Sequence, residues 1–141
     1  PLNKRGKRDA PRMGALLKQA DAVPDIIVSS AAKRARKTAE KVKQTSGCES
    51  DIVLESELYS AGPQAMIDII RLLPVDADSA MLVAHNPGME YMVGGLTGDV
   101  QAMPTAAIAE IVLPDINQWS DVDAKVQGRL VNVWRPKEVF S

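Results

Sequence analysis

The one histidine of the sequence stands between an apolar run and a turn signal. Residues 79–84 form the run, His85 ends it, and Asn86, Pro87 and Gly88 follow. A short apolar run bounded by turn residues predicts a buried strand of a parallel sheet. We therefore expect His85 at the carboxyl end of a central strand, where a helix begins. Ligands bind at that edge of open α/β sheets, and helix N-termini favour anions, so the placement indicates phosphate chemistry.

A second apolar run also ends in polar side chains. Ser29 and Ser30 close the run, and Arg34 and Arg36 fall in the first turns of the helix predicted after it. Parallel strands bring their carboxyl ends to one edge, so these groups can share a pocket with His85. The planar fork of arginine suits phosphate, and histidine can donate a hydrogen bond, transfer a proton or act as a nucleophile.

Several other chemistries lack the residues they need. One histidine and one cysteine, Cys48, cannot form a typical zinc site or an intrachain disulfide, and we expect no metal and no cofactor. No phosphate-binding or dinucleotide-binding glycine motif and no nucleophile elbow is present. The basic segment has no interleaved aromatics, which argues against nucleic acid. No apolar run approaches the ~20 residues of a membrane span and no signal peptide is visible, so we expect no membrane partner and a cytoplasmic protein.

Charge is divided unevenly along the chain. Residues 1–50 hold 12 Lys and Arg against 5 Asp and Glu, whereas residues 51–141 hold 5 against 13. The basic half could face an anionic ligand or an acidic protein, or it could be the solvated faces of two helices. Composition alone leaves these alternatives open.

The hydrophobic pattern predicts a single α/β domain over residues 1–141. Pro11 either kinks the first helix or marks its start. Alternating helices and strands imply a mostly parallel sheet covered on both faces, and the last two strands should pair as a hairpin. The predicted helices cover residues 3–20, 31–44, 63–73 and 87–96, and the predicted strands cover residues 25–30, 52–54, 79–84, 106–113 and 130–134.

Three ordered motifs resemble those of the histidine phosphatase superfamily, the phosphoglycerate-mutase-like group. They are Pro-Leu-Asn-Lys-Arg-Gly at residues 1–6, Ser-Ser-Ala-Ala-Lys-Arg-Ala-Arg-Lys-Thr-Ala-Glu at 29–40, and Val-Ala-His-Asn-Pro-Gly-Met-Glu at 83–90. The small size and the Leu-Tyr-Ser-Ala stretch at 58–61 are most similar to the SixA-type phosphohistidine phosphatases. The resemblance implies a three-layer α/β/α sandwich with a mostly parallel central sheet.

The resemblance also implies roles for individual residues. Arg34 would clamp the phosphoryl group, and His85 would be the second active-site histidine, stabilising charge on the phosphoryl oxygens. Backbone amides of Asn86 and Gly88 would help to position the site. The remaining expected site residues are Asn3 and Ser30 for substrate or phosphate binding and Glu57, with Glu55 as its neighbour, as a possible acid.

The sequence also departs from the family pattern. Ala31 and Lys37 stand where the family has proline and glutamine, and nothing matches the Arg-His-Gly or Arg-His-Ala motif of its nucleophile. We expect that motif, with the family's first strand, upstream of Pro1. The implied reaction is hydrolysis of a phosphohistidine in a protein through a phosphohistidine enzyme intermediate. The alternatives are a small-metabolite phosphomonoesterase of the same superfamily, or a non-catalytic phospho-ligand binder if the chain starts at Pro1.

Overall fold

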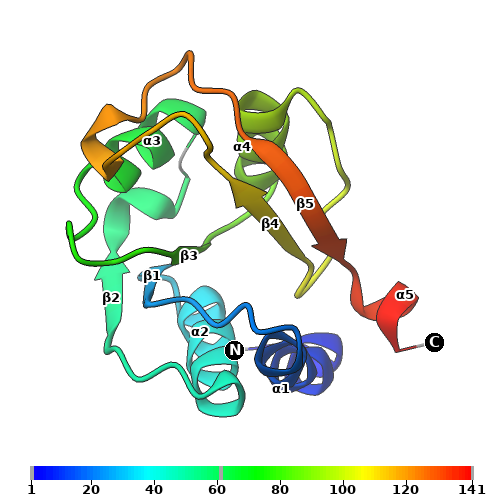
Figure 1. The fold of residues 1–141 in the computed structure, drawn as a ribbon. Helices are drawn as coiled ribbons and strands as arrows, with labels where there is room; N and C mark the ends of the chain where they lie inside the picture. The colour runs from blue at the N-terminus through cyan, green and yellow to red at the C-terminus, as the bar shows by residue number, and fades with distance from the viewer. Residues whose placement is uncertain (1, 61, 141) are drawn as a thin grey trace.

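The computed structural model describes residues 2–60 and 62–140, and it arranges them in three layers (Figure 1). Helices α1 (Lys4–Gln19) and α2 (Lys33–Ser46) lie side by side on one side of the strands, and α3 (Pro63–Arg71) and α4 (Gly88–Thr97) lie on the other. This confirms the predicted α/β/α sandwich. Pro1, which opens the first quoted motif, and Ala61, which ends the Leu-Tyr-Ser-Ala stretch, lie outside the described residues.

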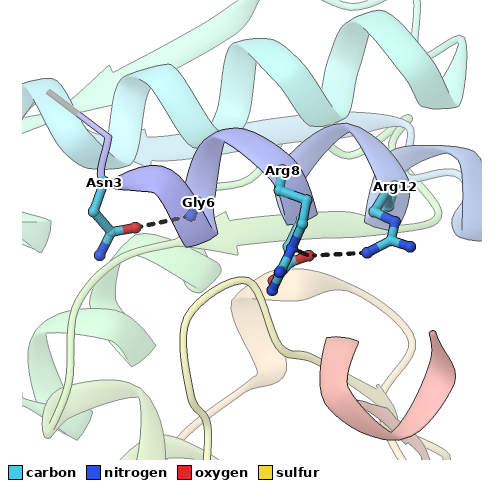
Figure 2. A network of polar contacts seen from close by, with 5 residues as sticks. Asn3, Gly6, Arg8 and Arg12 are labelled. Atoms are coloured by element: carbon cyan, nitrogen blue, oxygen red, sulfur yellow. Dashed lines mark hydrogen bonds and ion pairs between the residues drawn. The ribbon is translucent and has the colours of Figure 1, made fainter. Parts of the chain in front are cut away.

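Helix α1 begins after its predicted cap, Asn3, whereas α2 (Lys33–Ser46) lies two residues later at each end than the predicted 31–44. The side chain of Asn3 caps α1 by accepting a hydrogen bond of 2.8 Å from the amide of Gly6 (Figure 2). Pro11 lies inside α1, so the helix starts at Lys4 and not at the proline. Gly47 ends α2 with a φ of 81°, in the left-handed region that glycine adopts without strain.

The parallel sheet has the order β2-β1-β3. Strand β1 (Ile26–Ser30) pairs on one side with β2 (Ile52–Glu55) and on the other with β3 (Ala80–Val83). The prediction of a central strand before His85 is therefore wrong for the described chain, since β1 is central and β3 is an edge strand. Among the described residues β3 pairs with β1 alone, and an apolar run in the sequence does not show how many neighbours its strand will have.

Alternate residues of β1 point into two separate cores. Ile27 packs with Ala39 of α2 and with Cys48 on one face of the sheet. Its neighbour Val28 packs on the other face, in a larger cluster that includes Met66 of α3 and Met92 of α4. Successive side chains of a strand point to opposite faces, so one five-residue strand anchors both helix layers.

Strands β4 (Ile108–Val112) and β5 (Arg129–Trp134) form the predicted antiparallel hairpin, as a second sheet. Loop contacts attach this hairpin to the rest of the described chain. The amide of Gly128 donates to the Leu96 carbonyl at 2.6 Å, and Arg135 Nε donates to the Ala102 carbonyl at 2.9 Å. Strand β4 pairs with β5 and not with β3, so a gap divides the mostly parallel sheet that we predicted.

Short helices fill parts of the connections. The connections before α3 and before β5 contain the 3₁₀ turns η1 (Ser56–Leu58) and η2 (Trp119–Asp121), and a short helix α5 (Pro136–Val139), which was not predicted, follows β5. No helix in the described parts of the chain is long and apolar enough to cross a membrane.

Helix α1 carries one buried acidic side chain, Asp9. Asp9 is 1% exposed and accepts hydrogen bonds from Arg8 Nε at 2.8 Å and Arg12 Nη1 at 3.4 Å, two arginines drawn in Figure 2. The hydrogen bond from Arg8 is the main cause that lowers the pKa of Asp9. Arg12 also lies 4.4 Å over the ring centroid of Phe140, which ties the C-terminal segment to α1.

Gly14 allows the close packing of α1 on α2, and we predict that Gly14→Ala destabilises the fold. A Cβ at Gly14 would lie 2.7 Å from the Val42 carbonyl oxygen and would also meet Thr45. Backbone cannot yield cheaply, so we expect a loss of about 1–3 kcal/mol in the free energy of unfolding, measured in urea.

The matched control is Gly95→Ala in α4, where a Cβ would meet nothing within 4 Å. Alanine restricts the unfolded chain and favours helix, so this variant should be neutral or more stable by about 0.5–1 kcal/mol. Equal losses of stability in both variants would contradict the packing role of Gly14.

Candidate active site

A cavity of about 950 Å³ separates β3 from β4. Every residue of both strands lines it, and it reaches into both helix layers, to Met13 of α1 and Met66 of α3. Arg34 and His85 also line it. Since β3 ends at Val83 and α2 begins at Lys33, both polar residues lie at the edge of the sheet where ligands bind in open α/β folds.

Ser30 holds the imidazole of His85. Its Oγ lies 2.9 Å from His85 Nε2 and also accepts a hydrogen bond of 3.2 Å from the amide of Ala32. A hydroxyl that accepts from an amide keeps its own proton to donate. When Ser30 donates that proton to Nε2, the proton of the neutral ring sits on Nδ1, which is then a donor.

Arg34 acts on His85 through its charge. Burial is the main cause that lowers the pKa of His85 below its ordinary value of 6.5, and the positive charge of Arg34 lowers this pKa further. His85 is therefore neutral at pH 7. Arg34 itself is exposed, in the first turn of α2, so its guanidinium is accessible to an anion. Together the two residues offer one fixed charge and one imidazole that gains a proton when negative charge arrives.

Tyr59 also contacts His85, and sequence reasoning gave it no role. The two ring centroids lie 5.4 Å apart at an interplanar angle of 74°, an edge-on arrangement, while Tyr59 remains 65% exposed. The fully buried Leu58 anchors the turn that presents this ring. The Leu-Tyr-Ser stretch at 58–60 was the available signal, because it resembles a SixA segment, but nothing in its spacing indicates a contact with His85.

The side chain of Asn86 links the loop after α4 to the start of that helix through hydrogen bonds. Its Nδ2 donates to the Met103 carbonyl at 2.6 Å and to Glu90 Oε2 at 3.3 Å, and Glu90 Oε2 accepts from the Met103 amide at 2.8 Å. Gly88, the first residue of α4, is buried. The side chain of Asn86 is thus engaged in structure, and the backbone roles predicted for Asn86 and Gly88 stay predictions.

The other predicted site residues lie at different depths. Asn3 lines the cavity while capping α1, and Ser30 is fully buried behind His85. His85, Arg34 and Asn3 line one cavity and Ser30 contacts His85, whereas Glu57 is exposed in η1 and is not part of the lining. Arg36 also lies off the lining, and its buried Nε has no hydrogen-bond partner among the described residues.

Within residues 2–60 and 62–140, no group of three or more His, Cys, Asp or Glu side chains is placed to hold a metal ion. The polar groups gathered at the cavity are instead those that bind an oxyanion. Guanidinium, imidazole and asparagine side chains all donate hydrogen bonds, and charge-assisted bonds to phosphate are the strongest of these.

We predict that the pKa of His85, followed by NMR of its imidazole, lies below 6.5 in the protein. Arg34→Ala should raise this pKa, but not to its ordinary value, since burial remains. Inorganic phosphate should raise it in the wild type, because a nearby anion stabilises the charged ring.

Arg129→Ala is the control, because Arg129 is exposed in β5 and absent from the cavity lining, and it should leave the His85 pKa unchanged. A wild-type pKa at or above 6.5, or a fall of the pKa in Arg34→Ala, would contradict the assigned electrostatics.

This chain resembles known proteins in part of its sequence and in its fold. The model of the histidine phosphatase superfamily (branch 1) matches residues 1–59. No curated protein matches the chain in sequence. Among solved structures, a protein from Nakamurella multipartitia named as phosphohistidine phosphatase SixA has a TM-score of 0.84 at 22% identity, with 96% of this chain and 84% of that chain covered.

Two further SixA structures are similar. One from Agrobacterium tumefaciens is 26% identical, with a TM-score of 0.75 and coverage of 95% of this chain and 82% of that one. The other, a protein histidine phosphatase SixA complexed with tungstate, is 22% identical, with a TM-score of 0.77 and coverage of 99% and 86%. The motifs, the family match and the shared fold agree. The chain is similar to the histidine phosphatase superfamily over residues 1–59, and it shares its fold with the SixA phosphohistidine phosphatases.

Proposed function

We propose that this protein removes the phosphoryl group from phosphohistidine in a protein substrate. The observation that carries the proposal is the meeting of Arg34 and His85 on one cavity at the carboxyl edge of the parallel sheet. The names of the similar SixA structures support the same substrate class.

Arg34 and His85 would bind the transferring phosphoryl group together. The positive charge of Arg34 contributes to lowering the His85 pKa. A phosphoryl dianion bound beside Arg34 brings negative charge near the imidazole, and this raises the His85 pKa. The imidazole can then take up a proton and donate to a phosphoryl oxygen as charge develops in the transition state. Fixed donors of this kind need no reorganisation during the reaction, which is the main source of catalysis in phosphoryl transfer.

The phosphohistidine intermediate requires a nucleophilic histidine in addition to His85. We propose that it is carried by a strand that occupies the cavity between β3 and β4. Both strands present a backbone edge to this cavity, and unpaired backbone groups inside a fold are costly. A strand placed there would pair with β3 and would end at the same edge as His85.

The proposed reaction has two balanced steps. The nucleophilic histidine nitrogen attacks phosphorus, the bond from phosphorus to the substrate imidazole breaks, and that imidazole leaves after taking up a proton. Water then attacks the enzyme phosphohistidine, releasing inorganic phosphate and the free histidine. Imidazole leaves more readily than an alkoxide, which suits a site where the candidate acid Glu57 lies outside the cavity lining. The exposed ring of Tyr59 offers the leaving imidazole an aromatic surface.

We predict that Arg34→Ala and His85→Asn each lower kcat on a phosphohistidine protein by ~10²-fold or more, the usual loss for one electrostatic stabiliser. The protein should be expressed from its complete reading frame, and release of phosphate measured. Arg129→Ala makes the same change outside the cavity lining and should retain the wild-type rate. Absence of turnover by the wild type would refute the function, and a near-normal rate in either site variant would refute its role.

A further inference from the structure

Helices α1 and α2 form a basic face made of their outward side chains. Each helix holds six basic residues and one acidic residue. The acid of α1, Asp9, is buried and pairs with Arg8 and Arg12, so it offsets part of the charge of these two arginines only. The acid of α2, Glu40, is exposed and lies 4.0 Å from Lys37. We define this basic face by the exposed basic residues of both helices that do not pair with Asp9, apart from Arg34, namely Lys4, Arg5, Lys7, Lys18, Lys33, Lys37 and Lys41.

The N-terminal ends of α1 and α2, which carry part of the basic face, lie beside the candidate active site. Arg34, which lines the cavity, directly follows Lys33 at the start of α2. Asn3 lines the same cavity and caps α1, where Lys4 and Arg5 come next. The two helices pack directly on one another, with Gly14 against Val42. A partner that delivers a phosphoryl group to the cavity would therefore meet this positive surface.

Resting on the function proposed above, we propose that the basic face docks the phosphohistidine protein through an acidic surface around its modified histidine. The opposite charge of the rest of the chain makes the arrangement directional. Residues 51–141 carry 13 acidic against 5 basic residues, so an acidic partner is attracted to α1 and α2 more than to the rest of the chain. Such fields steer association and raise encounter rates.

The composition of the basic face favours a protein over a nucleic acid. Neither α1 nor α2 contains an aromatic residue on which bases could stack. Lys and Arg side chains on two adjacent helices can instead form many separate contacts with carboxylates. Because this attraction acts between exposed charges, it is screened by salt, with a Debye length of about 10 Å at 0.1 M.

The test compares two triple variants with the same change in net charge. Lys7→Glu, Lys33→Glu and Lys41→Glu together reverse part of the basic face. Lys125→Glu, Arg129→Glu and Lys137→Glu make the same reversal at exposed positions outside it. We expect the first triple variant to lower kcat/KM on an acidic phosphohistidine protein by at least tenfold and the second to leave it near the wild-type value. Both should turn over p-nitrophenyl phosphate at the wild-type rate.

The wild type provides an independent arm if a triple variant does not fold. Its kcat/KM on the phosphohistidine protein should fall steeply between 50 and 500 mM salt, because the Debye length falls from about 14 Å to about 4 Å, while p-nitrophenyl phosphate turnover stays flat. Equal losses in both triple variants, or no salt dependence, would overturn the docking proposal but leave the phosphatase function intact. Salt-sensitive binding of DNA, or dimers abolished by the first triple variant, would also overturn it.

Discussion

The hydrogen bond between Ser30 and His85 joins the ends of two neighbouring strands, and the candidate site depends on it. Ser29 pairs with Val83 in the register of β1 and β3, so Ser30 and His85 emerge from the sheet side by side. The same Ser30 hydroxyl accepts from the Ala32 amide at the start of α2. One buried side chain thus fixes the imidazole ring and the entry to the helix that carries Arg34. A neutral hydrogen bond of this kind contributes about 0.5–1.5 kcal/mol, but its larger effect is to preorganise the site.

Burial and charge then set the chemical state of the site. His85 is kept neutral by its partial burial and by the positive charge of Arg34, so the imidazole remains uncharged until an anion enters. Arg34 keeps a fixed positive charge at an exposed position beside the cavity. The edge-on ring of Tyr59 completes the surroundings of His85. These features favour a ligand that brings two negative charges over one that brings none.

Most elements of the fold follow from local patterns. Asn3 and Gly47 mark helix ends because capping and left-handed backbone are local requirements, and the apolar runs before Ser30 and His85 become adjacent parallel strands. The position of β3 at an edge of the described sheet could not be predicted, since strand order depends on contacts between distant segments. By contrast, the order of strands and polar residues in the sequence did predict that Arg34 and His85 lie at the same edge of the parallel sheet.

The limits of prediction at the site have the same physical origin. Tyr59 reaches His85 across the end of β1 from the turn after β2, and no periodicity encodes a contact between residues separated by a whole crossover connection. Glu57 was considered as an acid because it is near that turn in sequence, yet the structure leaves it off the cavity lining while Tyr59, two residues later, contacts the histidine. A 3₁₀ turn rotates successive side chains by roughly a third of a turn, so neighbours in sequence face different surroundings.

The most direct test of the account is a crystal structure of the protein with tungstate, an oxyanion that stands in for the phosphoryl group. The account predicts one tungstate at the cavity, with oxygens within hydrogen-bond distance of the Arg34 guanidinium and the His85 imidazole, and with Ser30 still bonded to Nε2. Tungstate bound elsewhere, with Arg34 and His85 making no contact to it at saturating concentration, would contradict the claim that these two residues form the phosphoryl site.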